Sequence, residues 1–291
     1  MAKMEIFLFM AALISSGVSS VLYWWHVAAL RTNRKRVRAA SLGAASVESA
    51  DVKEGFWDAG RFATIISING LLFLTLSLIA RWTATGHGPF SNMYEYSAAW
   101  AWGILVASIY FQWKYRTTVL SAVALPIATA FLIYAYTLPS RPTPLVPALQ
   151  QSLLLTLHVA VAIIAYGVSA IGFGAALFYL VQLGKRIQWL PAPAMLDDIG
   201  YRSVIIGFPF MTLTLVLGAL WADIAWGRYW SWDPKELATL VTWFIYGAYL
   251  HSRTLRGWKG TKSAILLMLG FGAAIFTYMG NYFFSGLHAY K

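Results

Sequence analysis

Five histidines and a cluster of tryptophans are the residues of this chain best suited to bind a ligand. The stretch "WADIAWGRYWSWDPKE", residues 221–236, holds four tryptophans and five charged side chains. A soluble protein core excludes that many charges, and a membrane-spanning helix does not tolerate them. Aromatic rings offer a flat, apolar surface, and the charged residues give it a polar rim. The stretch therefore predicts a surface for a flat, largely apolar ligand.

Two histidines flank this stretch and belong to different expected helices. His158 lies near the start of a helix expected at 153–183, and His288 follows a helix expected at 263–283. In the topology predicted below, both fall at the same face of the membrane as the tryptophans. Two imidazoles that approach opposite faces of an iron, above a floor of indoles, form a haem site. These residues therefore predict haem, or another flat ligand, at one membrane face.

Each of these features also has an ordinary structural interpretation. Tryptophan and tyrosine gather at membrane–water interfaces, and a single histidine at a helix end often reaches toward the headgroups. His26, which follows Trp24 and Trp25, fits that interpretation. An interfacial belt is spread over many helix ends, however, whereas this cluster occupies one segment and includes acidic residues. Composition alone leaves both interpretations open.

The composition places the chain in a membrane. Of its 291 residues, 59% are hydrophobic and 11% are charged, whereas soluble proteins carry about 25% charged residues. Several apolar runs reach the ~20 residues that cross a bilayer core, and backbone amides in lipid favour helices. We expect an all-α polytopic membrane protein, with residues 1–291 forming a single integral domain. Its eight transmembrane helices are expected at roughly 4–25, 62–80, 94–112, 118–138, 153–183, 203–221, 237–252 and 263–283.

The basic residues determine the expected orientation. Most of the 22 Lys and Arg residues fall in loops at one face, which the positive-inside rule assigns to the cytoplasm. The exceptions are Lys3, Arg81, Arg141, Arg228, Lys235 and Lys291. Both termini then lie on the non-cytoplasmic side, and the net charge of +11 predicts contact with the lipid bilayer and no nucleic acid. The expected loops are a cytoplasmic loop at 31–61 and outer loops at 85–93 (aromatic), 138–152 (Pro-rich) and 221–236 (tryptophan-rich).

A resemblance to a known family rests on the tryptophan stretch. The ordered pattern Trp221, Trp226-Gly227, Trp230, Trp232-Asp233-Pro234-Lys235-Glu236 resembles the WWD signature of haem-handling proteins that mature c-type cytochromes. Eight helices with this signature between the sixth and seventh resemble the CcsA (also called ResC) subunit of the system II cytochrome c synthase. The loop "HGPFSNMYEY" is similar to that family's own outer motif. The resemblance covers the chain from about residue 62 onward.

The resemblance implies roles for individual residues. His158 and His288 would ligate the iron of an outer haem, and His251 would ligate an inner haem within the membrane. The cysteine-free chain has no thiol chemistry of its own, and no catalytic acid or base is assigned beyond haem positioning. The expected haem-binding platform consists of Trp221, Trp226, Trp230, Trp232 and Asp233, with Arg228 as a partner for a propionate.

The function that the resemblance implies is cytochrome c biogenesis. The protein would move haem b to the outer face and present it, ligated by two histidines, for thioether attachment to the Cys-x-x-Cys-His segment of apocytochrome c. The implied setting is a haem-lyase (synthase) complex with a ResB/CcsB-type membrane subunit, in a bacterial inner (plasma) membrane with its active face outside the cytoplasm.

Two other classes of protein remain open. A b-type electron-transfer subunit holds haem between helices, commonly with two histidines on each of two helices, and no expected helix here carries two. A cofactor-free transporter would use Glu95 or Asp233 as a gating charge, but it leaves the tryptophan stretch unexplained.

Overall fold

The part of the chain that the structure describes folds into a bundle of eight helices. The computed structural model describes residues 2–43, 59–141, 150, 152–185, 187, 189–283 and 286–287. Within these ranges every regular element is an α-helix, which confirms the all-α polytopic architecture expected from the sequence. The helices are α1 (Ala2–Gly43), α2 (Ala59–Thr85), α3 (Met93–Tyr115), α4 (Ser121–Tyr136), α5 (Ser152–Val181), α6 (Pro193–Trp226), α7 (Pro234–Arg256) and α8 (Thr261–Phe283).

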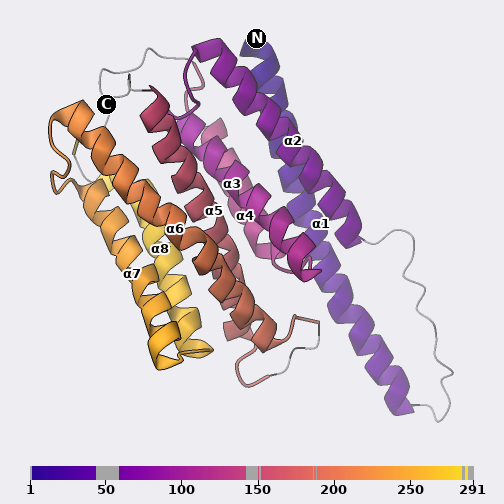
Figure 1. Cartoon of the computed structure of the whole chain (residues 1–291). Coiled ribbons are helices and arrows are strands. Elements are labelled where there is room, and N and C mark those ends of the chain that lie inside the picture. Colours follow the sequence, from indigo (N-terminus) through magenta and orange to yellow (C-terminus); the bar gives the residue numbers. More distant parts are fainter. Residues whose placement is uncertain are drawn as a thin grey trace.

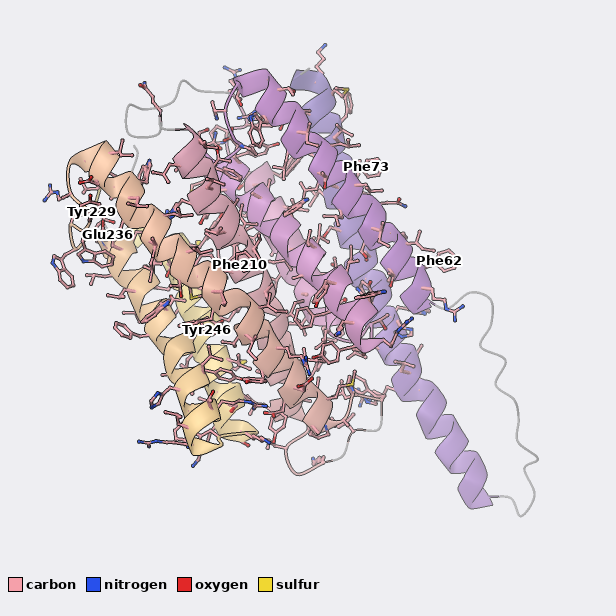
Figure 2. The ribbon with its side chains drawn as sticks, viewed as in Figure 1. Phe62, Phe73, Phe210, Tyr229, Glu236 and Tyr246 are labelled. Carbon is pink, nitrogen blue, oxygen red and sulfur yellow. The ribbon has the colours of Figure 1, made fainter. Side chains whose placement is uncertain are left out.

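The outer surface of the bundle is apolar, as a lipid environment requires. Phe62 and Phe73 point away from the bundle along α2 (Figure 2), and α6 exposes about half of the side chains of Leu213 and Val216. Apolar side chains can face lipid, and the helical backbone satisfies its own hydrogen bonds there, so such surfaces are stable on spanning helices. Five described helical stretches are long and apolar enough to cross a membrane: Lys3–Thr32, Ala59–Thr85, Leu153–Val181, Pro193–Trp226 and Thr261–Gly280.

The first helix extends well beyond its expected end. α1 continues to Gly43, although the apolar run predicted a helix at 4–25 and a cytoplasmic loop at 31–61. The basic run after residue 30 carries no apolar signal, but Arg, Lys and Ala are good helix formers, so the helix continues. Residues 44–58 of that expected loop lie outside the described residues, as do 142–149 and 151 of the Pro-rich loop.

The sixth helix is also longer than expected. Hydropathy predicted 203–221, but α6 begins at Pro193 and ends at Trp226. Its first turns contain Asp197, whose carboxylate accepts two hydrogen bonds from Arg253 of α7, at 2.9 and 2.7 Å. The carboxylate of Asp197 and the guanidinium of Arg253 thus satisfy each other across two helices. The hydropathy of α6 alone gives no sign of this pair.

The helices are arranged around α5. α5 packs against α3, α4, α6 and α8, while α1 packs against α2 and α4 on one side of the bundle and α7 packs against α6 and α8 on the other (Figure 1). α3 and α5 cross with their backbones in contact. A Cβ atom at Gly167 would lie 2.5 Å from the carbonyl carbon of Gly103, and one at Gly103 would lie 2.7 Å from the carbonyl oxygen of Ile163. Small residues at a crossing are typical of helices packed in a membrane.

One end of the bundle brings together the segments that were singled out in the sequence. The start of α1, the end of α2 and the connection between α6 and α7 lie at this end (Figure 1). Tyr94 at the start of α3 donates a hydrogen bond to Glu5 of α1, at 2.7 Å. Leu287, after α8, donates its backbone N–H to Asp233, at 2.6 Å. We call this the aromatic end.

Candidate functional site at the aromatic end

The tryptophan stretch is divided between two helices and a short connection, and is not one continuous loop over 221–236. Trp221 and Trp226 belong to the last turns of α6. Gly227 ends that helix in the left-handed conformation (φ 72°), and its N–H donates to the carbonyl of Asp223, a helix ending that favours glycine. α7 then begins at Pro234, so the connection is confined to residues 227–233.

Two acidic residues shape this connection. Asp233 caps α7, and its side chain accepts a hydrogen bond from the N–H of Lys235, at 3.0 Å. Glu236 completes a capping box by accepting from the N–H of Asp233 at 3.1 Å, and it also accepts from the N–H of Ser231 at 2.9 Å. Figure 2 shows Glu236 next to Tyr229 at this turn. The carboxylates of Asp233 and Glu236 thus hold the backbone of the connection that carries Trp230 and Trp232.

The four indoles form two perpendicular pairs. Trp221 and Trp226 pack edge to face, with ring centroids 4.7 Å apart, and Trp221 is buried against residues of α3 and α5. Trp230 and Trp232 form the second pair, with centroids 5.8 Å apart and planes at 90°. Trp232 is 68% exposed, so the outer pair presents the apolar face while the inner pair joins α6 to the core.

Trp232 has an unusual backbone conformation. Its φ is 61°, in the left-handed region that L side chains other than Asn and Asp rarely adopt. Strain of this kind, of order 1–3 kcal/mol, persists where the surrounding structure holds it in place, and it clusters at ligand sites. Here the hydrogen bonds of Glu236 to Ser231 and Asp233, on either side, hold it. The strain aims a large aromatic side chain outward.

His158 lies beside the inner pair of indoles. Its ring is nearly parallel to that of Trp221, with centroids 6.4 Å apart and planes 12° apart. Its Nδ1 is 2.9 Å from the backbone carbonyl oxygen of Thr214 in α6. A carbonyl oxygen can only accept, so Nδ1 carries the proton and the lone pair lies on Nε2. A histidine oriented in this way through its other nitrogen is typical of a metal ligand.

A glycine on α6 makes room for this imidazole. A Cβ atom at Gly218 would lie 2.8 Å from Cε1 and 3.1 Å from Nδ1 of His158. These distances are shorter than van der Waals contact, so only glycine allows the ring to reach the carbonyl of Thr214. Neither Thr214 nor Gly218 was identified from the sequence, because a backbone acceptor and a missing side chain leave no chemical signature.

The other histidines occupy different parts of the bundle. His251 is exposed near the end of α7 opposite the aromatic end. His26 packs on Gly60 of α2, so it lies on the α1 side of the bundle, across from His251 (Figure 1). His87 lies in the loop between α2 and α3, with Nδ1 2.9 Å from the carbonyl of Gly88. His288 lies outside the described residues.

The two basic residues of the tryptophan stretch differ in environment. Arg228 is exposed in the connection between α6 and α7. The amine of Lys235 lies 5.5 Å from the ring centroid of Tyr96, inside the aromatic end. Burial lowers the pKa of Lys235 to about 8, against the opposing effect of Asp233. Of the two, Arg228 is the one placed where a solvent-facing anionic group could reach it.

A buried charge network at the aromatic end was missed in the sequence. Nε of Arg81 donates to Glu95 at 2.7 Å, one of its Nη atoms donates to the carbonyl of Ser140 at 2.5 Å, and Glu5 lies 3.7 Å away. All three charged side chains are at most 4% exposed. Glu95 also accepts from the N–H and hydroxyl of Ser91, at 2.7 Å each. The signal available was three charged residues in otherwise apolar helix ends.

This network fixes the aromatic loop beside His158. The loop contains Gly88, where a Cβ atom would lie 2.6 Å from the hydroxyl oxygen of Thr156, two residues before His158 on α5. Phe90 of the same loop packs on the cluster that buries Trp221. The loop predicted at 85–93 therefore packs against α5 next to His158 and against the cluster that contains Trp221.

These residues fit a porphyrin. The imidazole of His158, with its lone pair on Nε2, can supply an iron ligand, and the exposed indole of Trp232 at the same end can supply an apolar face. The described residues thus define an integral membrane protein with a candidate ligand site at one end of a helical bundle.

Comparison with known proteins identifies the family. A family model described as Cytochrome C assembly protein matches residues 90–288. The cytochrome c biogenesis protein CcsA of Pyropia yezoensis is 34% identical over 284 residues, covering 81% of this chain and 89% of the relative. The CcsA of Prochlorococcus marinus (strain NATL2A) is 36% identical over 274 residues, covering 81% and 86%. The chain therefore belongs to the cytochrome c assembly protein family, as a member of the CcsA type, and acts in cytochrome c biogenesis.

A solved structure supports the fold. The protein described as cytochrome c heme lyase CcmF superposes with a TM-score of 0.63, covering 95% of this chain and 46% of that chain. The sequence identity is 17%, so the likeness concerns the fold alone.

Proposed function

We propose that the aromatic end holds haem b as a substrate, with His158 and His288 as its axial ligands. The protein presents this haem to the Cys-x-x-Cys-His segment of apocytochrome c. The geometry of His158 carries the proposal: its Nδ1 donates to Thr214, its Nε2 bears the lone pair, and its ring lies beside Trp221. Of the remaining indoles, Trp232 supplies an exposed apolar face next to the half-buried Trp230, and Arg228 pairs with a propionate.

The protein contributes positioning to this reaction. Haem supplies the vinyl groups, to which the two cysteine thiols of the apocytochrome add to give thioethers. Holding two reactants in a productive geometry accounts for a large part of a rate enhancement without any acid or base. A ring fixed by one backbone hydrogen bond and one glycine contact has little freedom, which suits that role.

A second haem contact is proposed at His251. This imidazole is exposed on the same face of α7 as Val241, Phe244 and Leu255. An imidazole on an apolar, outward-facing stripe can share a haem iron with a ligand from another chain. We assign that ligand to a ResB/CcsB-type membrane subunit, because α1, which carries His26, lies across the bundle from α7 (Figure 1).

The aromatic end is proposed to face away from the cytoplasm, in a bacterial inner membrane. The basic residues at the opposite helix ends support this orientation under the positive-inside rule. They lie at the end of α3, the end of α5, the start of α6, the end of α7 and the start of α8: Lys114, Arg116, Lys185, Arg202, Arg253, Arg256, Lys259 and Lys262.

An optical spectrum tests the proposal. The protein is purified with its partner subunit after haem-replete expression, and a Soret band of low-spin, bis-imidazole haem is expected. His158→Ala and His288→Ala should each change this band. A colourless wild-type protein would favour a cofactor-free transporter, and haem retained unchanged by both variants would favour a b-type electron-transfer subunit.

Gly218→Ala provides a test that leaves every ligand in place. The new methyl group would lie 2.8 Å from Cε1 of His158, so the ring must move away from the carbonyl of Thr214. Loss of such a supporting hydrogen bond lowers metal affinity by about 10–100-fold. Haem per protein, measured as the pyridine haemochrome, should fall accordingly.

The matched control is Gly272→Ala in α8, where the added methyl group meets nothing within 4 Å. Equal haem content in the two variants would contradict the role assigned to Gly218.

A further inference from the structure

The chain after α8 is tied to the start of α7 by one carboxylate. Asp233 uses its two oxygens differently: Oδ2 accepts from the N–H of Lys235 at 3.0 Å and caps α7, whereas Oδ1 accepts from the N–H of Leu287 at 2.6 Å. Asp233 is 6% exposed and Leu287 is 37% exposed, so this second hydrogen bond is partly buried. Leu287 immediately precedes His288 in the sequence.

A glycine allows this contact. A Cβ atom at Gly286 would overlap Oδ1 of Asp233 and would lie 3.1 Å from both the Cγ of Asp233 and the Cδ of Pro234. The backbone at residue 286 therefore passes directly against the carboxylate. Any larger residue would have to push the C-terminal segment away from the start of α7.

Capping alone does not require the second oxygen. Asn, Asp and Ser cap helices about equally well, because a cap needs one acceptor. In Asp233 that acceptor is Oδ2, and Oδ1 is committed to a segment 54 residues further along the chain. The contact between Asp233 and Leu287 is thus a separate feature, which we call the C-terminal latch.

We infer that Asp233 is a positioning residue for His288, because it holds the amide of Leu287, the residue directly before His288 in the sequence. This inference rests on the proposed function, since it concerns the second axial ligand. It also gives Asp233 the role of holding a ligand-bearing segment, in addition to the platform role that the family resemblance implies.

Two variants break the latch from opposite sides. Asp233→Ser keeps a capping oxygen for α7 but has none to reach Leu287. Gly286→Ala keeps the carboxylate and displaces the C-terminal segment. The control is Gly280→Ala on α8, where an added Cβ atom meets nothing within 4 Å.

Each variant is purified with the partner subunit and compared with His288→Ala by its haem spectrum and by thermal unfolding. We expect the latch variants to unfold like Gly280→Ala and to lose the low-spin, bis-imidazole band as His288→Ala does. Haem retention should fall about tenfold or more, as for other residues that orient a metal ligand. Added imidazole should restore the low-spin band in the latch variants and in His288→Ala, because it replaces the missing ligand.

The outcomes separate the two proposals. A His288→Ala spectrum identical to wild type would overturn the ligand assignment in the proposed function. A changed His288→Ala spectrum, with both latch variants indistinguishable from Gly280→Ala, would overturn the latch alone. Rescue of His288→Ala by imidazole without rescue of the latch variants would also overturn it, since the damage would then extend beyond one ligand.

Discussion

His158→Ala is expected to reduce cytochrome c maturation to the level of a strain that lacks this protein. The substitution removes the imidazole whose orientation is fixed by Thr214 and Gly218. Changes that only disturb the support of a metal ligand cost about 10–100-fold in metal affinity. Removal of the ligand itself should cost at least as much, and no other described histidine lies beside Trp221 to replace it.

The measurement is covalent haem on a reporter cytochrome c, with the membrane level of the variant determined in parallel. His26→Ala is the matched control, because that imidazole packs on α2 at the α1 side of the bundle. We expect the control to mature the reporter almost normally, and His251→Ala and His288→Ala to fail. Normal maturation by His158→Ala at normal protein levels would be incompatible with the proposed site.

Arg81→Ala is expected to destabilise the protein more than any other single charge removal in the described chain. Arg81 is 2% exposed, and it is the cation between Glu95 and Glu5. Breaking a buried ion pair costs about 3–5 kcal/mol, because the remaining charge is left buried without its partner. Here two buried carboxylates would remain without their cation, and one of them, Glu95, is the acceptor that holds Ser91 of the loop.

The free energy of unfolding in detergent micelles, or the midpoint of thermal unfolding, measures this effect. Arg202→Ala serves as the control, because the pair of Arg202 and Asp198 is an exposed i, i+4 pair on α6. Solvent screens such an exposed pair, so its loss should change stability far less than the loss of a buried one. Equal destabilisation by the two substitutions would show that the Arg81 network does not hold the aromatic end together.

The sequence was sufficient to predict that the helices exist, but it was insufficient to predict the residues at which they begin and end. Apolar runs identified eight helices because burial in lipid acts on every residue of a span. The ends depend on local hydrogen bonds. Gly227 and the Asp233–Glu236 capping box divide the tryptophan stretch, and both are signals readable in the sequence, although hydropathy does not measure them.

For the candidate site, the sequence identified the side chains but not the hydrogen bonds and ion pairs that hold them in place. Membrane depth was enough to place His158 at the face of the tryptophans. Its acceptor is a backbone carbonyl 56 residues away, and Arg81 joins Glu5 to Glu95 across three helices. Such contacts depend on which helices are neighbours, and hydropathy carries no information on that.

The crossing of Gly103 and Gly167 constrains how a porphyrin can travel. The backbones of α3 and α5 are in contact at this crossing, so a macrocycle cannot pass between the two helices at that point. If haem moves from His251 to His158 as proposed, it cannot pass between α3 and α5 at this crossing. We would then expect it to travel along the lipid-facing side of α6 and α7, next to the proposed partner subunit.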